Sequence, residues 1–197
     1  CGICPVSHNL CAAKALDAVV GSVPPPSAVK LRRLMHAGQV LQSHALHFFH
    51  LASPDLLFGF DGEVAKRNLI GLVEAHPDLA KKGVLLRKFG QQVLEAVYGK
   101  RIHGTGAIPG GVNRHLSIEA RDTFLRQIAE VKSWAQEAVA LAQRLTETNL
   151  EHHRGFGTVP SALLSLVASD GSLDLYDGGL RAKDADGRVP FDGLDGS

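Results

Sequence analysis

Two long segments that contain no proline limit the folds open to this chain. Residues 27–52 hold a single glycine and are predicted to form one long helix that ends at Ser53-Pro54-Asp55. Residues 118–152, with Ser117 as the N-cap, are predicted to form the longest helix. The apolar residues of this second segment advance by three or four, which predicts one buried stripe: Leu125, Ile128, Val131, Ala135, Ala138 and Ala142. These lengths favour a mainly α fold built as a bundle of long helices.

Shorter helices are predicted elsewhere in the first 155 residues. They cover residues 5–20, 64–75 and 79–98, and the glycines at positions 21 and 99 are expected to end the first and the last of them. The segment IHGTGAIPGGVNR, residues 102–114, contains four glycines and a proline, which predicts irregular backbone.

The pattern changes to β after Gly155. The stretch LLSLVAS, the pair Asp170-Gly171 and the stretch SLDLYD predict a β-hairpin, because Asp-Gly supplies the positive φ values of a tight turn. A second turn at residues 184–187 is expected to extend it into a small antiparallel meander. The prediction is one partial domain over residues 1–197, with a helical part at 1–155 and a β annex at 156–197.

Composition narrows the environment and the partners. A formal net charge of +1 gives no reason to expect nucleic acid or an anionic membrane surface as a partner. No apolar run reaches the roughly 18 residues that span a bilayer, and nothing resembles a signal peptide. All three cysteines lie within the first eleven residues, which fits local thiol chemistry in a reducing compartment. A cytoplasmic location is therefore expected.

The chain begins with CGICPVSH, in which Cys1, Cys4 and His8 could serve several kinds of site. A zinc site needs a second pair of ligands at related spacing, and no cysteine follows Cys11. A thioredoxin-like dithiol needs a strand before the C-x-x-C, and none is predicted. Two further alternatives are a pair of buried thiols in a helical core and soft thiolates that hold nickel and iron. The spacing alone leaves these alternatives open.

Four stretches resemble the large subunit of nickel–iron (NiFe) hydrogenases. CGICPVSHNLCAAKALD resembles that family's N-terminal metal motif, Arg-x-Cys-Gly-x-Cys-x-x-x-His, and LMHAGQVLQSHALHFFHLASPD resembles its His-rich helix. HGTGAIPGGVNR resembles its glycine-rich segment, and LVASDGSLDLYDGGLR resembles the β annex of the cytoplasmic, bidirectional, NAD-reducing type. The resemblance runs over essentially the whole chain in order, and it covers well under half of a full subunit, whose N- and C-terminal parts are expected to be missing.

The resemblance implies roles for a few residues. Cys1 would be a terminal thiolate on nickel, and Cys4 a thiolate that bridges nickel and iron. His8 would hydrogen-bond near the bridging sulfur, and His103 would help to shape the backbone close to the centre. The family's second cysteine pair, Asp-Pro-Cys-x-x-Cys, does not occur in this sequence, and no catalytic residue is assigned.

The resemblance also implies an activity and partners. The full enzyme would reversibly oxidise H2 to protons and electrons, with carbon monoxide and cyanide on iron supplied by maturation proteins. Iron–sulfur clusters would sit on a small subunit, and FMN and NAD on diaphorase subunits, because this chain has no four-cysteine cluster motif. The chain alone is expected to be inactive. A zinc-stabilised helical interaction module and the related quinone-reductase subunit of respiratory complexes are the alternatives.

Two further features of the sequence are a group of histidines and the third cysteine. His36, His47 and His50 fall on one face of the helix predicted for residues 27–52. They could be ordinary buried histidines or could face the metal pocket or a partner's cluster. Cys11 lies outside the metal pattern and is expected to be a buried bystander.

Overall fold

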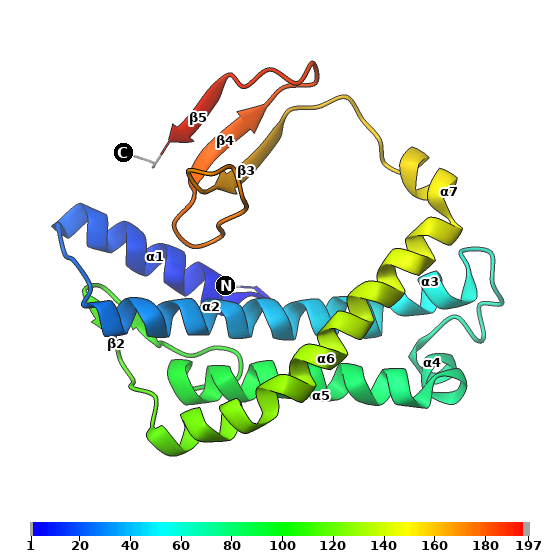
Figure 1. The fold of residues 1–197 in the computed structure, drawn as a ribbon, viewed down its shortest axis with the longest axis horizontal. Coiled ribbons are helices and arrows are strands. Elements are labelled where there is room, and N and C mark those ends of the chain that lie inside the picture. Colours follow the sequence, from blue (N-terminus) through cyan, green and yellow to red (C-terminus); the bar gives the residue numbers. More distant parts are fainter. Residues whose placement is uncertain (1, 195–197) are drawn as a thin grey trace. The chain divides into compact units, whose positions relative to one another are not determined.

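The computed structural model describes residues 2–194 and divides the chain into two compact units, Cys1–Glu147 and Thr148–Ser197. The first unit is almost entirely helical, and the second contains a small antiparallel sheet. The mainly α fold with a β annex near the C-terminus is therefore confirmed. Figure 1 traces the elements of each unit in chain order.

The first helix, α1 (Pro5–Val20), has the bounds that the sequence predicts. Pro5 occupies the first turn, where its missing N–H costs nothing, and Cys4 is the residue that precedes the helix. Gly21 ends the helix with a φ of 64°, a left-handed conformation that glycine adopts without strain. The C-x-x-C motif therefore leads directly into α1.

The prediction of a single α-helix over residues 27–52 is wrong in the type of helix and in the residue at which the helix ends. α2 (Pro26–Leu46) is followed by a π-helix, η1 (His47–Ala52), and the helical backbone continues through α3 (Ser53–Phe58). Pro54 does not end it, because proline is accepted in the first turn of α3.

Ser53 and Pro54 explain why the backbone widens at η1. The Ser53 N–H bonds to the Phe48 carbonyl, five residues back, as in a π-helix. The same pattern would pair the Phe49 carbonyl with the N–H of residue 54, which proline lacks. The fully buried Ser53 hydroxyl donates to the Phe49 carbonyl instead, at 2.8 Å. The buried carbonyl is thereby satisfied without an α-helical bond.

The next two helices start at clear signals. α4 (Leu69–Ala75) is shorter than the predicted 64–75, because the Asn68 side chain accepts from the Ile70 and Gly71 N–H groups and sets the start of the helix. α5 (Pro77–Tyr98) follows and ends at Gly99, as predicted. Its buried face runs from Ala80 to Tyr98.

Helices α2 and α5 pack side by side along most of their length (Figure 1). Glycines on both helices permit the close approach. A Cβ at Gly90 would lie 2.8 Å from the Gln42 Cβ and 2.9 Å from the Gly38 carbonyl oxygen, and one at Gly38 would lie 3.1 Å from a Val93 methyl. The α2–α5 pair forms the centre of the first unit.

The longest helix, α6 (Ile118–Thr148), starts as predicted, with the Ser117 hydroxyl accepting from the Ala120 N–H at 3.1 Å. It ends earlier than expected, at Thr148, and α7 (Leu150–Gly155) follows. Of the predicted stripe, Val131 is buried and Ala135 and Ala138 pack against the core. Leu125 and Ile128 are exposed in the part of the chain that the structure describes.

The glycine-rich segment holds more order than predicted. β1 (Ala107–Ile108) and β2 (Gly111–Val112) pair antiparallel through a tight turn. Gly110 has a φ of 79° in that turn, which explains why glycine stands there.

The β annex is confirmed, but one strand partner is wrong. β3 (Leu163–Val167) pairs with β4 (Gly179–Lys183), and β4 pairs with β5 (Phe191–Leu194). The turn at Asp170-Gly171 does form, yet the segment after it makes a single bridge, Val167 to Leu173. The 184–187 turn then joins β4 to β5 as expected.

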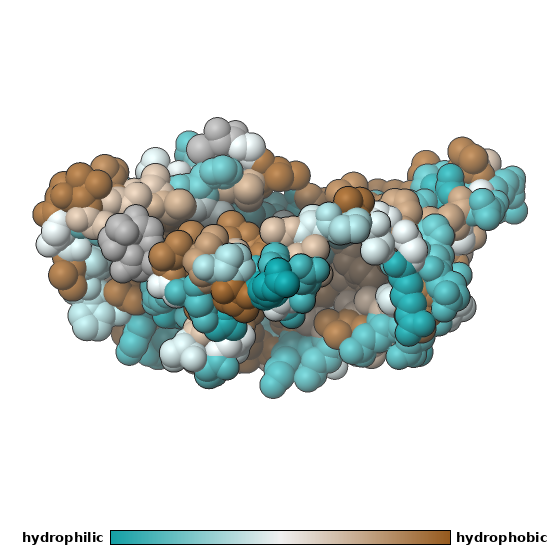
Figure 2. Space-filling model, turned by 90° about the horizontal axis from the view of Figure 1, so that it is seen from above, coloured by the Kyte–Doolittle hydropathy of each residue, from teal (hydrophilic) through white to brown (hydrophobic). Residues whose placement is uncertain are grey.

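Among residues 2–194, no helix is long and apolar enough to cross a membrane. Figure 2 shows apolar side chains exposed between polar ones on the surface. Three exposed apolar side chains lie at the end of α1 and just after it: Val19, Val20 and Val23 are 80, 64 and 89% exposed.

Candidate functional site

Cys4 is the predicted metal ligand that the structure describes, while Cys1 lies outside the described residues. The Cys4 thiol is free and partly exposed at the start of α1. Its backbone has a φ of −116° and a ψ of 56°, outside both helix and strand, and its carbonyl accepts from the His8 N–H at 3.3 Å. The first turn of α1 therefore determines where this thiol is presented.

The two histidines predicted near the centre have exposed side chains. His8 lies one turn after Cys4, so its imidazole is on the same end of α1. His103 lies in the loop that precedes Gly104. Their roles beside a metal stay predictions. The expectation that Cys11 is buried is wrong, because its thiol is exposed on α1.

A buried ion pair joins α1, α2 and the β1–β2 turn. Arg32 is 1% exposed, and its Nη1 donates to the Asp17 Oδ2 at 2.5 Å. The other guanidinium nitrogens donate to backbone carbonyls, Nε to Gly111 at 3.0 Å and Nη2 to Ile108 at 2.6 Å. Asp17 Oδ1 accepts from the Gly110 N–H at 2.6 Å. The two side chains thus bind both strands of the hairpin and the turn between them.

These contacts shift the titration of Asp17. The hydrogen bond from Arg32 lowers the pKa of the Asp17 carboxyl below its ordinary value of 3.8. Burial of the carboxyl opposes this change, and the Gly110 N–H reinforces it. The carboxylate form is therefore the one that the fold prefers.

The lowered pKa gives the Asp17 contribution a defined pH range. In the unfolded chain the carboxyl titrates near 3.8, so the contribution is complete above that pH and is lost as the pH falls toward the lower folded value. We expect the difference in unfolding free energy between the wild type and Asp17→Asn to narrow as the pH falls from about 6 to about 3. Urea unfolding at each pH measures it, and a difference that stays constant would contradict the shift.

The structure affects the prediction that His36, His47 and His50 lie on one helical face. That prediction assumes an uninterrupted α-helix, whereas the π-helix η1 changes the angle between successive side chains from His47 onward. His36 and His50 are partly buried, whereas His47 is exposed. The His50 Nδ1 is a buried atom without a hydrogen-bond partner among the described residues. Nothing here assigns these imidazoles to a metal.

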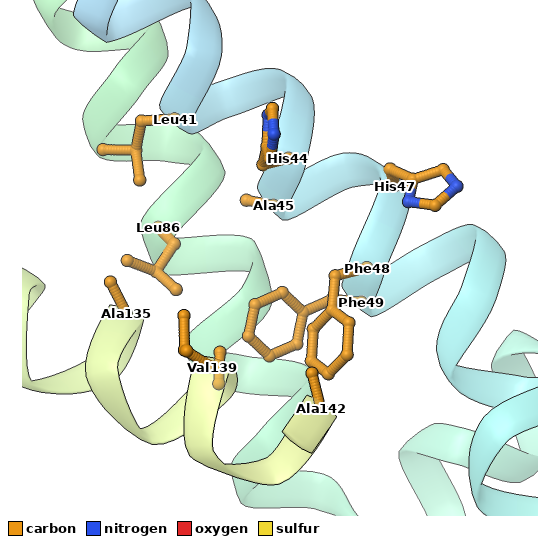
Figure 3. Close-up of a pocket in the computed structure, with 11 residues that line it drawn as sticks. Leu41, His44, Ala45, His47, Phe48, Phe49, Leu86, Ala135, Val139 and Ala142 are labelled. Atoms are coloured by element: carbon orange, nitrogen blue, oxygen red, sulfur yellow. The ribbon is translucent and has the colours of Figure 1, made fainter. Parts of the chain in front are cut away.

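A cavity of about 330 Å³ lies between α2, η1, α5 and α6. Figure 3 shows the rings of Phe48 and Phe49 directed toward Val139 and Ala142, whereas the His47 imidazole points away from them. The lining is almost wholly apolar and includes neither Cys4, His8 nor His103. A catalytic pocket usually holds a few convergent polar groups, so this cavity is not the site of the thiol chemistry.

Sequence reasoning missed the Asp17–Arg32 pair, although a signal was present. Asp17 follows Val6, Leu10 and Ala13 on the buried face of α1. Arg32 stands on the buried face of α2. An acidic residue and a basic residue on two apolar faces suggest a buried pair, because isolated buried charges are rarely tolerated.

Comparison with known proteins places the chain in a family. The family model for nickel-dependent hydrogenases matches residues 1–58. The beta subunit of the NAD-reducing hydrogenase HoxS from Cupriavidus necator is 44% identical, over 96% of this chain and 41% of that subunit. A vhu subunit of the F420-non-reducing hydrogenase from Methanocaldococcus jannaschii is 43% identical, over 95% of this chain and 45% of that relative.

Solved structures agree with these relatives. The crystal structure of an NAD+-reducing nickel–iron hydrogenase in the H2-reduced state matches with a TM-score of 0.92 and 54% identity, over 99% of this chain and 44% of that one. The Ni-Fe-Se hydrogenase from D. vulgaris Hildenborough matches with a TM-score of 0.77 at 23% identity, which shows the shared fold alone. The chain spans less than half the length of these curated relatives. The chain therefore belongs to the nickel-dependent hydrogenase family and corresponds to part of a large subunit.

Proposed function

We propose that the full-length protein is a hydrogenase that reversibly oxidises H2 to protons and electrons, and that this chain forms part of its nickel–iron-bearing large subunit. The 44% identity to the beta subunit of the NAD-reducing hydrogenase HoxS, over 96% of this chain, carries the proposal. The agreement includes the motif in which Cys4 precedes α1.

The described residues include a ligand of the type that a nickel–iron centre needs, but too few ligands to hold the metals. Cys4 offers a free, partly exposed sulfur, the soft donor that such metals favour. Among residues 2–194, no group of three or more His, Cys, Asp or Glu side chains is placed to hold a metal ion. We assign Cys1 and Cys4 as two ligands, and the remaining ligands to the part of the protein beyond these residues. The bound metals would supply the Lewis acidity that polarises H2.

The chain's own residues would orient the sulfur rather than transfer electrons. Iron–sulfur clusters on a hydrogenase small subunit would carry the electrons away, because this chain has no four-cysteine cluster motif. Diaphorase subunits would hold FMN and NAD, and maturation proteins would deliver the iron with its carbon monoxide and cyanide.

NAD is the electron acceptor that we assign. The 54% identity to the solved NAD+-reducing enzyme supports this choice over the acceptor of the F420-non-reducing relatives. NAD is a solute of the cytoplasm, so this acceptor also implies a cytoplasmic enzyme.

Nickel analysis and H2-dependent NAD+ reduction test the proposal. The full-length protein, produced together with its maturation proteins and partner subunits, is expected to contain stoichiometric nickel and to reduce NAD+ with H2. The 197-residue chain produced in the same cells is expected to contain neither nickel nor activity, because its donor set is incomplete.

Two results would overturn the proposal. One is stoichiometric nickel in the 197-residue chain alone, which would mean that these residues form a complete site. The other is a nickel-loaded full-length complex that does not react with H2.

A further inference from the structure

Two glycines in the segment before β1 lie against opposite edges of one buried ring. A Cβ atom at Gly104 would lie 2.7 Å from the Tyr98 Cδ1, and one at Gly106 would lie 2.7 Å from the Tyr98 Cδ2. Carbon atoms do not approach this closely without displacement, so side chains are excluded at both positions. The backbone of residues 104–106 therefore clamps the ring from both edges.

The remaining contacts of Tyr98 also restrain it. It is the last residue of α5 and is 2% exposed. Gly99, with a φ of 91°, ends the helix after it. The ring belongs to the same core cluster as Val6, Leu10 and Ala107. A ring held on so many sides is a rigid support for whatever packs against it.

The clamped ring reaches the first turn of α1. The Tyr98 hydroxyl lies 3.4 Å from the Pro5 carbonyl oxygen, and Pro5 directly follows Cys4. Burial raises the pKa of the Tyr98 hydroxyl, so the group stays protonated and can donate. One residue beyond the clamp, the Ala107 N–H donates to the Asn9 Oδ1 at 3.2 Å. The segment 104–107 thus holds α1 both through Tyr98 and directly.

We infer that Tyr98, clamped between Gly104 and Gly106, is a positioning residue whose ring fixes the first turn of α1 and thereby the direction of the Cys4 thiol. The inference rests on the proposed function, in which Cys4 binds the metal. Cys4 itself precedes the helix, so its position is inherited from Pro5 and Val6. Both of these residues are buried.

The ring rather than the hydroxyl supplies most of this support. A distance of 3.4 Å is long for an O–H···O hydrogen bond, whose usual length is about 2.7–2.8 Å. Phenylalanine would keep the clamped ring and lose only the weak bond. Leucine would keep an apolar side chain and lose the planar ring that the two glycines enclose.

The test compares Tyr98→Leu with Tyr98→Phe in the nickel-loaded full-length complex. Tyr98→Phe is expected to leave kcat, KM for H2 and the nickel X-ray absorption spectrum as in the wild type. Tyr98→Leu is expected to keep stoichiometric nickel, to lower kcat on the order of tenfold or more at unchanged KM, and to alter the nickel–sulfur part of the spectrum. If the leucine variant does not accumulate, Tyr98→Met fills the same space with a flexible side chain and gives the same comparison.

A glycine pair supplies a matched control. Gly106→Ala is expected to reproduce the effect of Tyr98→Leu, because its Cβ would lie 2.7 Å from both the Cα and the ring Cδ2 of Tyr98 and would displace that residue. Gly155→Ala introduces the same methyl group where nothing lies within 4 Å, and it is expected to change nothing.

The outcomes separate this inference from the proposed function. A wild-type complex that binds nickel and oxidises H2, together with Tyr98→Leu and Tyr98→Met variants of unchanged kcat and spectrum, would overturn the inference alone. A wild-type complex without nickel would overturn both. Equal losses in Tyr98→Phe and Tyr98→Leu would also overturn it, since the hydroxyl would then carry the effect.

Discussion

Replacing Cys4 by serine in the full-length protein is expected to remove nickel and to lower H2 oxidation by more than about a hundredfold. Losses of 10- to 100-fold already follow from changing residues that merely surround metal ligands, and loss of a ligand should exceed them. A serine hydroxyl is a hard, weakly acidic donor that does not substitute for a soft thiolate on nickel. Elemental analysis and the rate of H2-dependent NAD+ reduction measure the two effects.

Cys11→Ser provides the matched control on the same helix. Its thiol is exposed and lies seven residues after Cys4, outside the C-x-x-C motif. This variant should keep wild-type nickel content and rate. If Cys4→Ser retained both while remaining folded, the assignment of Cys4 as a ligand would be wrong.

Replacing Arg32 by methionine is expected to cause the largest loss of stability, about 3–5 kcal/mol, the usual cost of removing one partner from a buried ion pair. Methionine would leave the Asp17 carboxylate buried without its partner, and the carbonyls of Ile108 and Gly111 without their donors. The β1–β2 turn would lose its attachment to α2. Thermal or urea unfolding of the full-length protein measures the change.

An exposed pair supplies the comparison for this variant. Arg101→Met removes a guanidinium that is 62% exposed and pairs with Glu95, and surface pairs of this kind contribute about 0–1 kcal/mol. Arg32→Lys should fall between the two, because lysine keeps the charge but cannot donate in three directions from one plane. Equal effects of Arg32→Met and Arg101→Met would show that burial does not strengthen the Asp17–Arg32 interaction.

The helices and several of their ends follow from local signals in the sequence. Pro5 and Gly21 bound α1, and Ser117 caps α6. These signals act between residues within one helical turn, so they can be recognised in the sequence without knowledge of the tertiary contacts. The C-x-x-C motif is equally local as a signal, because Cys4 directly precedes Pro5 at the start of α1.

The features that the sequence did not predict depend on distant partners. β3 pairs with residues 179–183 rather than with the segment after Asp170-Gly171, and strand pairing over such a distance is not determined by a turn. Arg32 and Gly111 are 79 residues apart, so their contact requires the completed fold. Tyr98 gives no motif of its own, because its role depends on Gly104 and Gly106 enclosing the ring.

Deleting one residue from η1 (His47–Ala52) would let α2 continue as a regular α-helix and leave the orientation of α3 unchanged, because a π-helical turn accommodates one extra residue. If all six residues instead adopted α-helical geometry, α3 would rotate by about 100° about its axis, and its side chains that now face the interior would turn toward solvent. The helix type of η1, together with the number of its residues, therefore determines which side chains of α3 are buried. Homologous chains can therefore be aligned reliably here only if the extra residue is counted.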